Sequence, residues 1–397
     1  MKKCFSIILF LVAVSTVLFL GNIEIFKGHV ATINDSAEEV KVGLNLELTG
    51  PLQSYGVEQA NGALMAFEQI NQAGGVNGIR IVPFKVDNQS DPVRSAFLAN
   101  RLMTQEGVAV ALGPATSDNF LATIPAATEN KIPIVSATAT ADNITIDKNG
   151  STYDYVFRII FPDSLQGNSM ANFALNNLNA KRAIVIRELN DAYSEDLAQN
   201  FIRTIRANDG SLVDLMNYTS NETDFTSIIN RIKGIAFDVI YLPGYDQEAG
   251  NFIKQAREMG ITQPILGGDA YDSPRLLEVA GASALNNVYF TSGYSPLNEN
   301  PLAQQFINDY REKYGKEPDS FSALGYDAAR FVADAIRRAG SGNPQAIRDA
   351  MTTTENFEGV AGNFSIGPDH NPIKPVYVID LENGVPVQSI IVEQTND

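Results

Sequence analysis

Short apolar runs alternate with longer amphipathic segments from Val40 onward. The short runs are rich in Val, Ile and Leu, which is typical of buried strands. Between them, apolar residues recur at helical spacing, as at Ala60, Leu64 and Phe67. Strands that alternate with helices predict a parallel sheet covered by helices on both faces. The strands predicted in the first half are 40–46, 79–86, 107–113 and 132–136.

Two local signals predict helix boundaries in this first half. The predicted helix 57–71 ends at Gly74-Gly75, because glycine readily adopts the left-handed conformation that ends a helix. Asp91-Pro92 predicts a helix start, with the aspartate as N-cap and the proline in the first position.

The same alternation restarts after Pro162. The stretch 301–352 is predicted to be helical. The stretch 375–393 predicts a β-hairpin, because Asn383-Gly384 favours a tight turn between two strands. The other strands predicted in this half are 181–188, 210–218, 237–244 and 263–268.

The N-terminus is basic and then strongly apolar. Lys2 and Lys3 precede an apolar run at 4–21, which is the pattern of a secretory signal. The run is almost long enough to cross a membrane, so an uncleaved anchor is the alternative. We therefore predict a signal peptide or N-terminal anchor at 1–31, a tether at 32–39 and a periplasmic or other extracytoplasmic location. Membrane contact is expected only through this segment, if it is uncleaved.

Charge and composition exclude two classes of function. The 397 residues include 29 Lys and Arg against 46 Asp and Glu, which gives a net charge of −17. Such a surface repels phosphate backbones and excludes a general nucleic-acid binder. One Cys and two His are too few for a Cys/His zinc site. We therefore expect neither a nucleic-acid partner nor a metal.

The sequence lacks the common catalytic motifs. It contains no P-loop phosphate motif, no GxSxG nucleophile elbow and no HExxH zinc helix. His29 and His370 have no obvious partner in the sequence. These observations favour a binding protein without a cofactor over an enzyme.

The loops near the predicted strand ends offer groups that suit a small zwitterion. Ligand sites of open α/β sheets lie at the carboxyl ends of strands. Ser117 stands at a helix start after one strand, the loop 136–143 follows the next, and Asp269 follows a later one. Tyr55 and Tyr245 stand in two further loops. Taken singly, these residues are explained by a helix cap, a polar loop and a turn. Together they supply donors for a carboxylate, an acceptor for an ammonium and aromatic walls.

Eight segments stand in a distinctive order and spacing from Val40 to the C-terminus. They are TGPLQSYG (49–56), GALMAFEQINQAGGVNG (62–78), DNQSDPVRSAFLANRL (87–102), LGPATSD (112–118), IPIVSATAT (132–140), FDVIYLPGY (237–245), PILGGD (264–269) and FSALGYDAARFVADAI (321–336). In these segments the chain resembles the leucine/isoleucine/valine-binding proteins of ABC transporters, which are type I periplasmic binding proteins.

The resemblance implies two doubly wound α/β lobes that are joined by a three-crossing hinge, with a ligand cleft between them. Lobe one would comprise 40–162 plus 295–370, and lobe two 163–294 plus 371–397. The implied function is that of an extracytoplasmic substrate-binding protein. It would capture a free amino acid, branched-chain or otherwise apolar or neutral, by lobe closure and deliver it to ABC transporter permease subunits. We further expect a monomer without enzymatic activity.

The resemblance also assigns roles to individual residues. The Ser117 hydroxyl and nearby main-chain N–H groups would hold the ligand carboxylate, and the hydroxyl and main chain of Thr140 would contact the zwitterion. The Thr138 carbonyl and the Asp269 carboxylate would accept from the ligand ammonium. The remaining contacts would be aromatic or apolar: Tyr55, Tyr193, Tyr245 and Phe321.

The chain departs from the family pattern in three respects. Asp269 stands where relatives have Glu, and Thr138 adds a hydroxyl near the pocket. Ser90 and Thr116 occupy positions where relatives carry a disulfide, so that bond is absent. Two alternatives with the same fold stay open: a relative that binds an uncharged amide or urea, and a sensory ligand-binding domain.

Overall fold

The computed structural model describes residues 38–392. The predicted signal peptide or anchor at 1–31, and the tether up to residue 37, lie outside the described residues. The first strand begins at Glu39, at the end of the predicted tether. In the described part of the chain, no helix has both the length and the apolar character that crossing a membrane requires.

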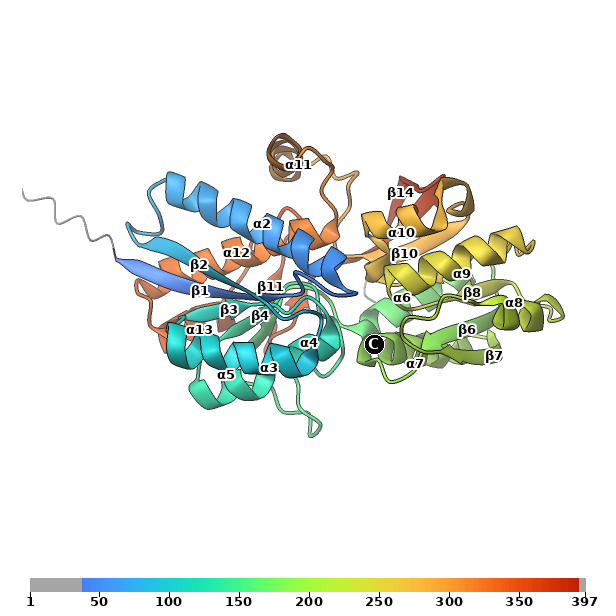
Figure 1. Ribbon diagram of the computed structural model, residues 1–397, viewed down its shortest axis with the longest axis horizontal. Coiled ribbons are helices and arrows are strands. Elements are labelled where there is room, and N and C mark those ends of the chain that lie inside the picture. Colours follow the sequence, from blue (N-terminus) through green and yellow to red (C-terminus); the bar gives the residue numbers. More distant parts are fainter. Residues whose placement is uncertain (1–37, 393–397) are drawn as a thin grey trace, which may run out of the picture. The chain divides into compact units, whose positions relative to one another are not determined.

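The first sheet has five parallel strands in the order β2-β1-β3-β4-β5 (Figure 1). Its strands are β1 (Glu39–Leu46), β2 (Arg80–Asp87), β3 (Val110–Leu112), β4 (Ile134–Ser136) and β5 (Val156–Arg158). The helices between them are α2 (Gln53–Gln72), α3 (Pro92–Arg101) with a π-helical turn at Leu102–Glu106, α4 (Ser117–Leu121) and α5 (Ile124–Asn130). Because all strands are parallel, their carboxyl ends meet at one edge of the sheet.

The second sheet has seven strands in the order β14-β13-β10-β9-β8-β6-β7. Its strands are β6 (Arg182–Glu188), β7 (Ser211–Tyr218), β8 (Val239–Tyr241), β9 (Ile265–Gly267), β10 (Val288–Ser292), β13 (Val376–Glu382) and β14 (Val385–Val392). Its helices are α6 (Asp163–Asn176), α7 (Ala192–Ala207), α8 (Thr226–Lys233), α9 (Asp246–Glu258) and α10 (Pro274–Ala280), with 3-10 turns at Asp269–Tyr271 and Ala282–Ala284. Strands β6 to β10 are parallel, whereas β13 and β14 are antiparallel to their neighbours.

The chain returns to the first sheet between β10 and β13. The returning elements are α11 (Pro301–Tyr314), α12 (Ser320–Ala339), α13 (Pro344–Thr352), β11 (Ser365–Ile366) and β12 (Pro372–Ile373). Helix α12 packs along α2 with backbone in contact at Gly62 and Gly325, where an added Cβ would overlap the carbonyl oxygens of Ser322 and Gln59. Residues far apart in sequence therefore build one layer on the first sheet.

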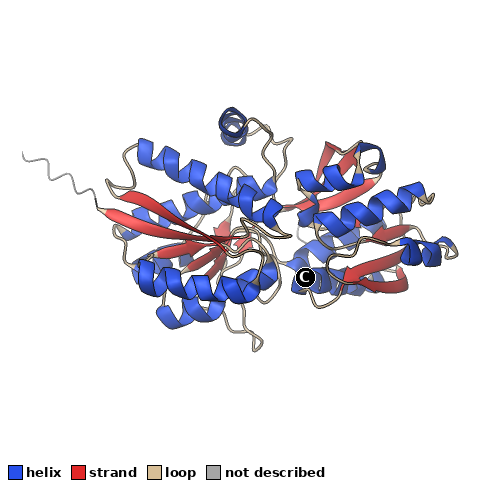
Figure 2. Ribbon diagram, viewed as in Figure 1, coloured by secondary structure: helices blue, strands red, loops and turns tan. Residues whose placement is uncertain are grey.

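Each sheet is covered on both faces by helices (Figure 2). In β6, Ala183 and Val185 belong to a core that includes α6 and α7, whereas Ile184 and Ile186 belong to one that includes α8, α9 and α10. Successive residues of a strand point to opposite faces, so both faces of this strand are buried. The predicted α/β class, with helices on both faces of a parallel sheet, is confirmed.

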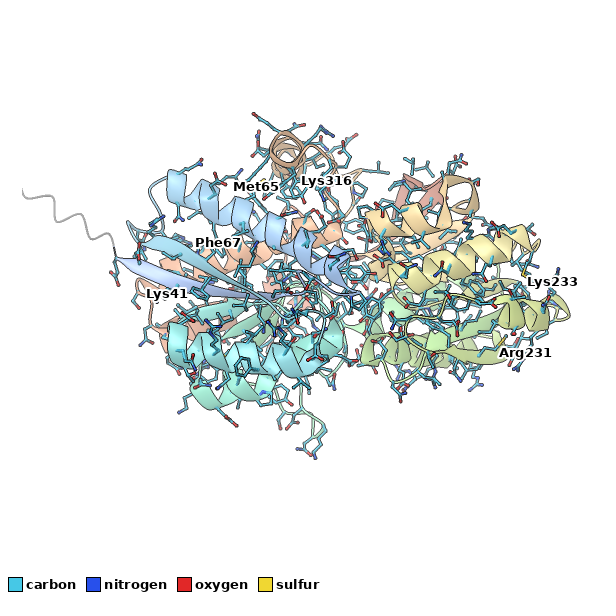
Figure 3. The ribbon with its side chains drawn as sticks, viewed as in Figure 1. Lys41, Met65, Phe67, Arg231, Lys233 and Lys316 are labelled. Atoms are coloured by element: carbon cyan, nitrogen blue, oxygen red, sulfur yellow. The ribbon has the colours of Figure 1, made fainter. Side chains whose placement is uncertain are left out.

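Many charged side chains lie at the surface of these layers (Figure 3). Met65 and Phe67 of α2 are buried, whereas Lys41 of β1 and Arg231 and Lys233 of α8 are exposed. This separation of apolar and charged positions is what the periodicity of the sequence predicts.

The local turn and cap signals are confirmed. Asp91 is the N-cap of α3, and its side chain accepts a hydrogen bond from the Arg94 N–H. The turn between β13 and β14 has Asn383 at φ 51° and Gly384 at φ 75°. Both residues adopt the left-handed conformation that a tight hairpin turn of this kind requires.

Candidate functional site

One cavity is lined by all eight residues that the sequence analysis assigns to a ligand site. They are Tyr55, Ser117, Thr138, Thr140, Tyr193, Tyr245, Asp269 and Phe321. The lining is completed by Ala115, Thr116, Ala139 and Ala270. Segments that follow β3 and β4 of the first sheet meet segments that follow β6, β8 and β9 of the second. The cavity therefore lies where open α/β sheets commonly bind ligands.

Tyr55 lies in a helix, and its predicted place in a loop is wrong. Helix α2 begins at Gln53, so Tyr55 belongs to its first turn. The N-cap residue Leu52 is held by Ser90, whose Oγ accepts a hydrogen bond of 3.1 Å from the Leu52 N–H. This contact fixes the start of the helix, and the Tyr55 side chain is fully buried.

A buried carboxylate organises the loop after β3. Glu47 accepts hydrogen bonds from the main-chain N–H groups of Ala115 (3.0 Å) and Thr116 (3.2 Å) and from the Thr116 hydroxyl (2.8 Å). Burial raises the pKa of Glu47, and these hydrogen bonds oppose the rise. No local pattern in the sequence marks Glu47 as part of the site, because its partners lie 68 and 69 residues further along the chain.

Ser117 does not cap its own helix. The N-cap residue of α4 is Thr116, whereas Ser117 Oγ accepts hydrogen bonds from the N–H groups of Thr140 (3.3 Å) and Ala141 (3.1 Å). These contacts occupy the lone pairs of the oxygen and leave the hydroxyl hydrogen for another acceptor. The corner where the loops after β3 and β4 meet thus offers the Ser117 hydroxyl as a donor to an anion.

The additional hydroxyl of Thr138 has partners within the protein. Its Oγ1 lies 2.8 Å from Gln59 Oε1 and 2.8 Å from the carbonyl oxygen of Ala115. A hydroxyl has a single hydrogen to donate, and both neighbours are acceptors. The departure from the family pattern at this position therefore adds no free donor to the cavity.

Asp269 is a buried carboxylate held by two neutral donors. Its Oδ1 accepts hydrogen bonds from the Tyr193 hydroxyl (2.9 Å) and from Gln166 Nε2 (3.1 Å). Burial raises the pKa of Asp269 to about 6, and the hydrogen bonds from Gln166 and Tyr193 act in the opposite direction. Gln166 Oε1 in turn accepts from the Asp269 N–H (3.2 Å), which fixes the amide orientation. The sequence analysis misses Gln166, since no pattern marks a helix glutamine that reaches a distant loop.

Four aromatic rings line the cavity and contact one another. The ring centroids are 4.7 Å apart for Tyr55 and Phe321, 5.6 Å for Tyr55 and Tyr245, and 5.4 Å for Tyr193 and Tyr245. Such tilted and stacked rings form a stiff apolar wall.

The Tyr55 hydroxyl links helix α2 to two segments that follow strands of the second sheet. It accepts a hydrogen bond from the Asp246 N–H (2.8 Å) and donates one to the Ala270 carbonyl (3.3 Å). Beside it, Ser54 Oγ donates to Asp246 Oδ2 (2.8 Å). The polar end of this ring is therefore occupied by protein groups.

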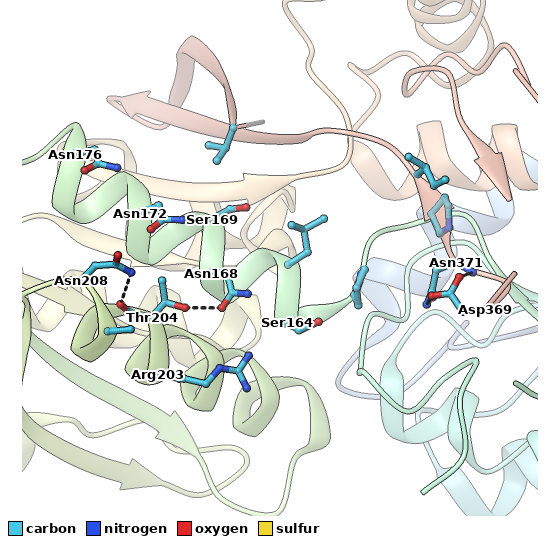
Figure 4. A pocket seen from close by; sticks show the side chains of 16 residues that line it. Ser164, Asn168, Ser169, Asn172, Asn176, Arg203, Thr204, Asn208, Asp369 and Asn371 are labelled. Carbon is cyan, nitrogen blue, oxygen red and sulfur yellow. Dashed lines mark hydrogen bonds between the residues drawn. The ribbon is translucent and has the colours of Figure 1, made fainter. Parts of the chain in front are cut away.

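A larger polar groove of about 1020 Å³ lies between α6, α7 and the segment around β12 (Figure 4). Asn168, Asn172 and Thr204 line it from the helices, and Asp369 and Asn371 line it from the other side. None of the eight residues above contributes to its lining. The smaller cavity is the candidate site, because it combines an anion-binding corner, a carboxylate and an apolar wall.

Comparisons with known proteins agree with this geometry. Residues 39–385 match the family described as periplasmic binding protein. A branched-chain amino acid transporter substrate-binding protein, LivJ of Streptococcus pneumoniae in complex with isoleucine, is 36% identical, covers 89% of this chain and 99% of its own, and has a TM-score of 0.85. A leucine-binding protein, LivK of Thermotoga maritima, is 33% identical over 89% and 98% of the two chains, with a TM-score of 0.82.

A relative that is compared by sequence is also an amino-acid-binding protein. A leucine-, isoleucine-, valine-, threonine- and alanine-binding protein of Pseudomonas aeruginosa is 26% identical over 84% of this chain and 87% of its own. The family match and the two solved structures extend over nearly the whole described chain. The chain therefore belongs to the type I periplasmic binding proteins, in the family of branched-chain amino acid substrate-binding proteins of ABC transporters.

Proposed function

We propose that this protein captures a free amino acid with an apolar side chain outside the cytoplasm and delivers it to the permease of an ABC transporter. The observation that carries the proposal is the single cavity that joins the Ser117 corner, the Asp269 carboxylate and the aromatic wall. An amino acid has a matching carboxylate, ammonium and side chain. No covalent step, cofactor or enzymatic activity is part of the proposal.

Each part of the ligand has its own set of partners. The carboxylate accepts from the Ser117 hydroxyl, and Thr140 contacts the zwitterion beside it. The ammonium donates to the Asp269 carboxylate and the Thr138 carbonyl. Charged groups attract strongly here because the lining residues are buried and water is excluded.

Hydroxyl groups around the cavity are already hydrogen-bonded to other protein groups, and this favours a ligand with an apolar side chain. The hydroxyls of Tyr55 and Thr138 already have protein partners. A ligand hydroxyl or amide placed beside the rings of Tyr245 and Phe321 would lose its bonds to water without replacing them. Branched-chain amino acids avoid that cost.

Ligand binding is proposed to act through closure of two lobes. We assign 40–162 plus 295–370 to lobe one and 163–294 plus 371–397 to lobe two. Ser117, with its neighbours, would dock the ligand on lobe one, and Asp269 would then close over it from lobe two. A ligand that contacts both lobes favours the closed state by its differential affinity. We propose that a monomer in this closed state is what the permease recognises.

Calorimetric titration tests the proposal. The full chain is unfolded and refolded to remove any bound ligand, and is then titrated with the twenty amino acids, urea and acetamide. We expect tight binding of Leu, Ile or Val. Binding of amides or urea alone would contradict the role of Asp269, and a preference for polar side chains would contradict the role of the aromatic wall. Silence across the panel would contradict transport of amino acids and favour a sensory role with another ligand class.

Affinity for the amino acid is expected to fall below about pH 6. The pKa of Asp269 is raised to about 6, so the free site is ionised above this pH and protonated below it. A protonated Asp269 must lose its proton before it pairs with an ammonium, which raises Kd by up to about tenfold per pH unit. Titrations between about pH 5 and about pH 8 check this expectation.

The midpoint of this pH dependence, together with the variant Asp269→Asn, identifies the group. Burial also raises the pKa of Asp272, which does not line the cavity, to about 6, that of Asp191 to about 7 and that of Glu188 to about 8. A midpoint near the value of Asp269 that disappears in Asp269→Asn supports its role, whereas a midpoint at either higher value, or a constant affinity, contradicts it.

A further inference from the structure

Arg158 is a fully buried cation at the end of β5. In the described chain, its side chain donates four hydrogen bonds, and every acceptor is a neutral oxygen. Burial lowers the pKa of Arg158 to about 10, so the guanidinium stays charged at neutral pH. A buried charge is costly unless an opposite charge compensates it.

Two peptide carbonyls beside the candidate site accept hydrogen bonds from this guanidinium. Arg158 Nη1 donates to the carbonyl oxygens of Thr140 (2.7 Å) and Ala141 (2.9 Å). The Thr140 carbonyl and the Ala141 N–H belong to the same peptide group, and that N–H donates to Ser117 Oγ. A chain of hydrogen bonds thus runs from the guanidinium through one peptide to the hydroxyl of Ser117.

The other side of the guanidinium is fixed by Asn371. Its Oδ1 accepts from Arg158 Nε (2.8 Å) and Nη2 (2.6 Å), and its Nδ2 donates to Asp369 Oδ2 (2.7 Å). Figure 4 shows Asp369 and Asn371 side by side at the edge of the polar groove. On this side Arg158 is therefore hydrogen-bonded to an amide. The Asp369 carboxylate is bonded to that amide and not to the guanidinium.

Four carboxylates act on Arg158 from beyond hydrogen-bonding contact. They are Asp163, Asp142, Asp369 and Asp196, and each favours the charged guanidinium. They come from α6, the loop after β4, the segment before β12 and α7. None of them makes a direct hydrogen bond to the guanidinium, whose direct contacts are the two peptide carbonyls and the Asn371 amide.

We propose that Arg158 is a positioning residue whose charge compensates the ligand carboxylate through the peptide group between Thr140 and Ala141. The inference rests on the proposed function, in which that carboxylate binds to Ser117. Hydrogen bonds in a chain polarise one another, so a cation at one end strengthens donation at the other. The ligand carboxylate is thereby held by neutral donors, and the Arg158 charge strengthens the hydrogen bond that Ser117 donates.

A charge swap at the two neighbouring side chains tests this. The double variant Asp369→Asn plus Asn371→Asp keeps the net charge and the paired side chains, but moves the carboxylate into direct contact with Arg158. The guanidinium is then neutralised locally. We expect Kd for L-leucine to rise about tenfold, which corresponds to about 1.4 kcal/mol. The melting temperature should not fall, because a buried cation gains a partner.

An uncharged ligand analogue and a single variant separate the effect of charge from the effect of a structural change. L-leucinamide lacks the carboxylate charge, so its affinity, measured by competition, should not fall in the double variant. The control Asp369→Asn, which leaves the contact with Arg158 neutral, should bind L-leucine within about threefold of the unaltered protein. An unchanged Kd for L-leucine in the double variant, or an equal loss for both ligands, would overturn the proposal.

If the charge swap disturbs folding, a second variant tests the role of the Arg158 charge. Arg158→Lys keeps the charge and loses the fork of hydrogen bonds. We expect its Kd for L-leucine to stay within about fivefold of the unaltered protein. A larger rise in Kd at an unchanged melting temperature would assign the effect to the forked hydrogen bonds and would overturn the proposed role of the charge. If the unaltered protein binds no amino acid at all, it is the proposed function that fails.

Discussion

Replacing Asp269 by asparagine is expected to weaken amino acid binding by about 100-fold and to leave the fold intact. Asparagine keeps an oxygen that accepts from Tyr193 and Gln166, so the local hydrogen bonds survive. The charge that faces the ligand ammonium is lost. Removing one partner of a buried charge pair typically costs about 2–5 kcal/mol, and 100-fold in Kd corresponds to about 2.7 kcal/mol.

A second buried aspartate provides the matched control. Asp327 of α12 is 1% exposed and accepts hydrogen bonds from the N–H groups of Val360 and Ala361 (2.8 Å each), and it does not line the cavity. Asp327→Asn should lower stability and leave Kd unchanged. Calorimetry and thermal melting of both variants separate the two effects. Equal affinities of Asp269→Asn and the unaltered protein would remove Asp269 from the ammonium site.

Gly62→Ala is expected to destabilise the protein by about 3 kcal/mol, near the upper end of what overpacking usually costs. The added methyl group would overlap the Ser322 carbonyl oxygen, which is backbone and has little room to move. Helices α2 and α12 must then separate. Because α2 carries Tyr55 and α12 carries Phe321, the contact between these two rings should loosen as well.

The matched control is the same substitution in an open position. Gly234 has φ −85°, and an added Cβ would lie 3.9 Å from the Arg231 carbonyl oxygen. Gly234→Ala should change stability by no more than about 0.5 kcal/mol. Urea unfolding followed by circular dichroism measures both variants. If Gly62→Ala unfolds at the same urea concentration as the unaltered protein, the close helix contact is not required.

The parallel sheets explain why much of the candidate cavity could be predicted. Ser117, the loop 136–143 and Asp269 each follow a strand whose apolar run is visible in the sequence. Because β3 and β4 are parallel and adjacent, the loops after them meet at one edge of the first sheet, whereas Asp269 follows β9 of the second sheet. Tyr193 and Phe321 carry no such signal, and only the resemblance to a known family placed them in the site.

The buried polar groups behind the cavity could not be predicted in this way. Glu47, Gln166 and Arg158 each pair with loop atoms on other elements, and nothing local in the sequence records the pairing. Read alone, each resembles an ordinary surface residue. Their burial depends on the tertiary structure, which brings distant loops over them.

Short strands and helix starts limited the prediction of the fold. β5 and β10 were not predicted, because polar residues interrupt their apolar runs, Arg158 in β5 and Thr291 and Ser292 in β10. The early start of α2, which places Tyr55 in a helix, depends on Ser90 in the loop after β2, 38 residues further along the chain. Longer periodic segments, such as the helices within 301–352, were predictable because many residues contribute to the pattern.

The order of strands in the second sheet has a consequence for synthesis. β13 pairs with β10, although three helices of the other sheet lie between them in the chain. On the first sheet, Tyr326 bonds to Gln69 from 257 residues away. A ribosome must therefore make almost the whole chain before either sheet gains its full set of neighbours. Such long-range pairing slows folding. For a family that works outside the cytoplasm, this delay lengthens the time in which the polypeptide is still extended enough for a secretion channel.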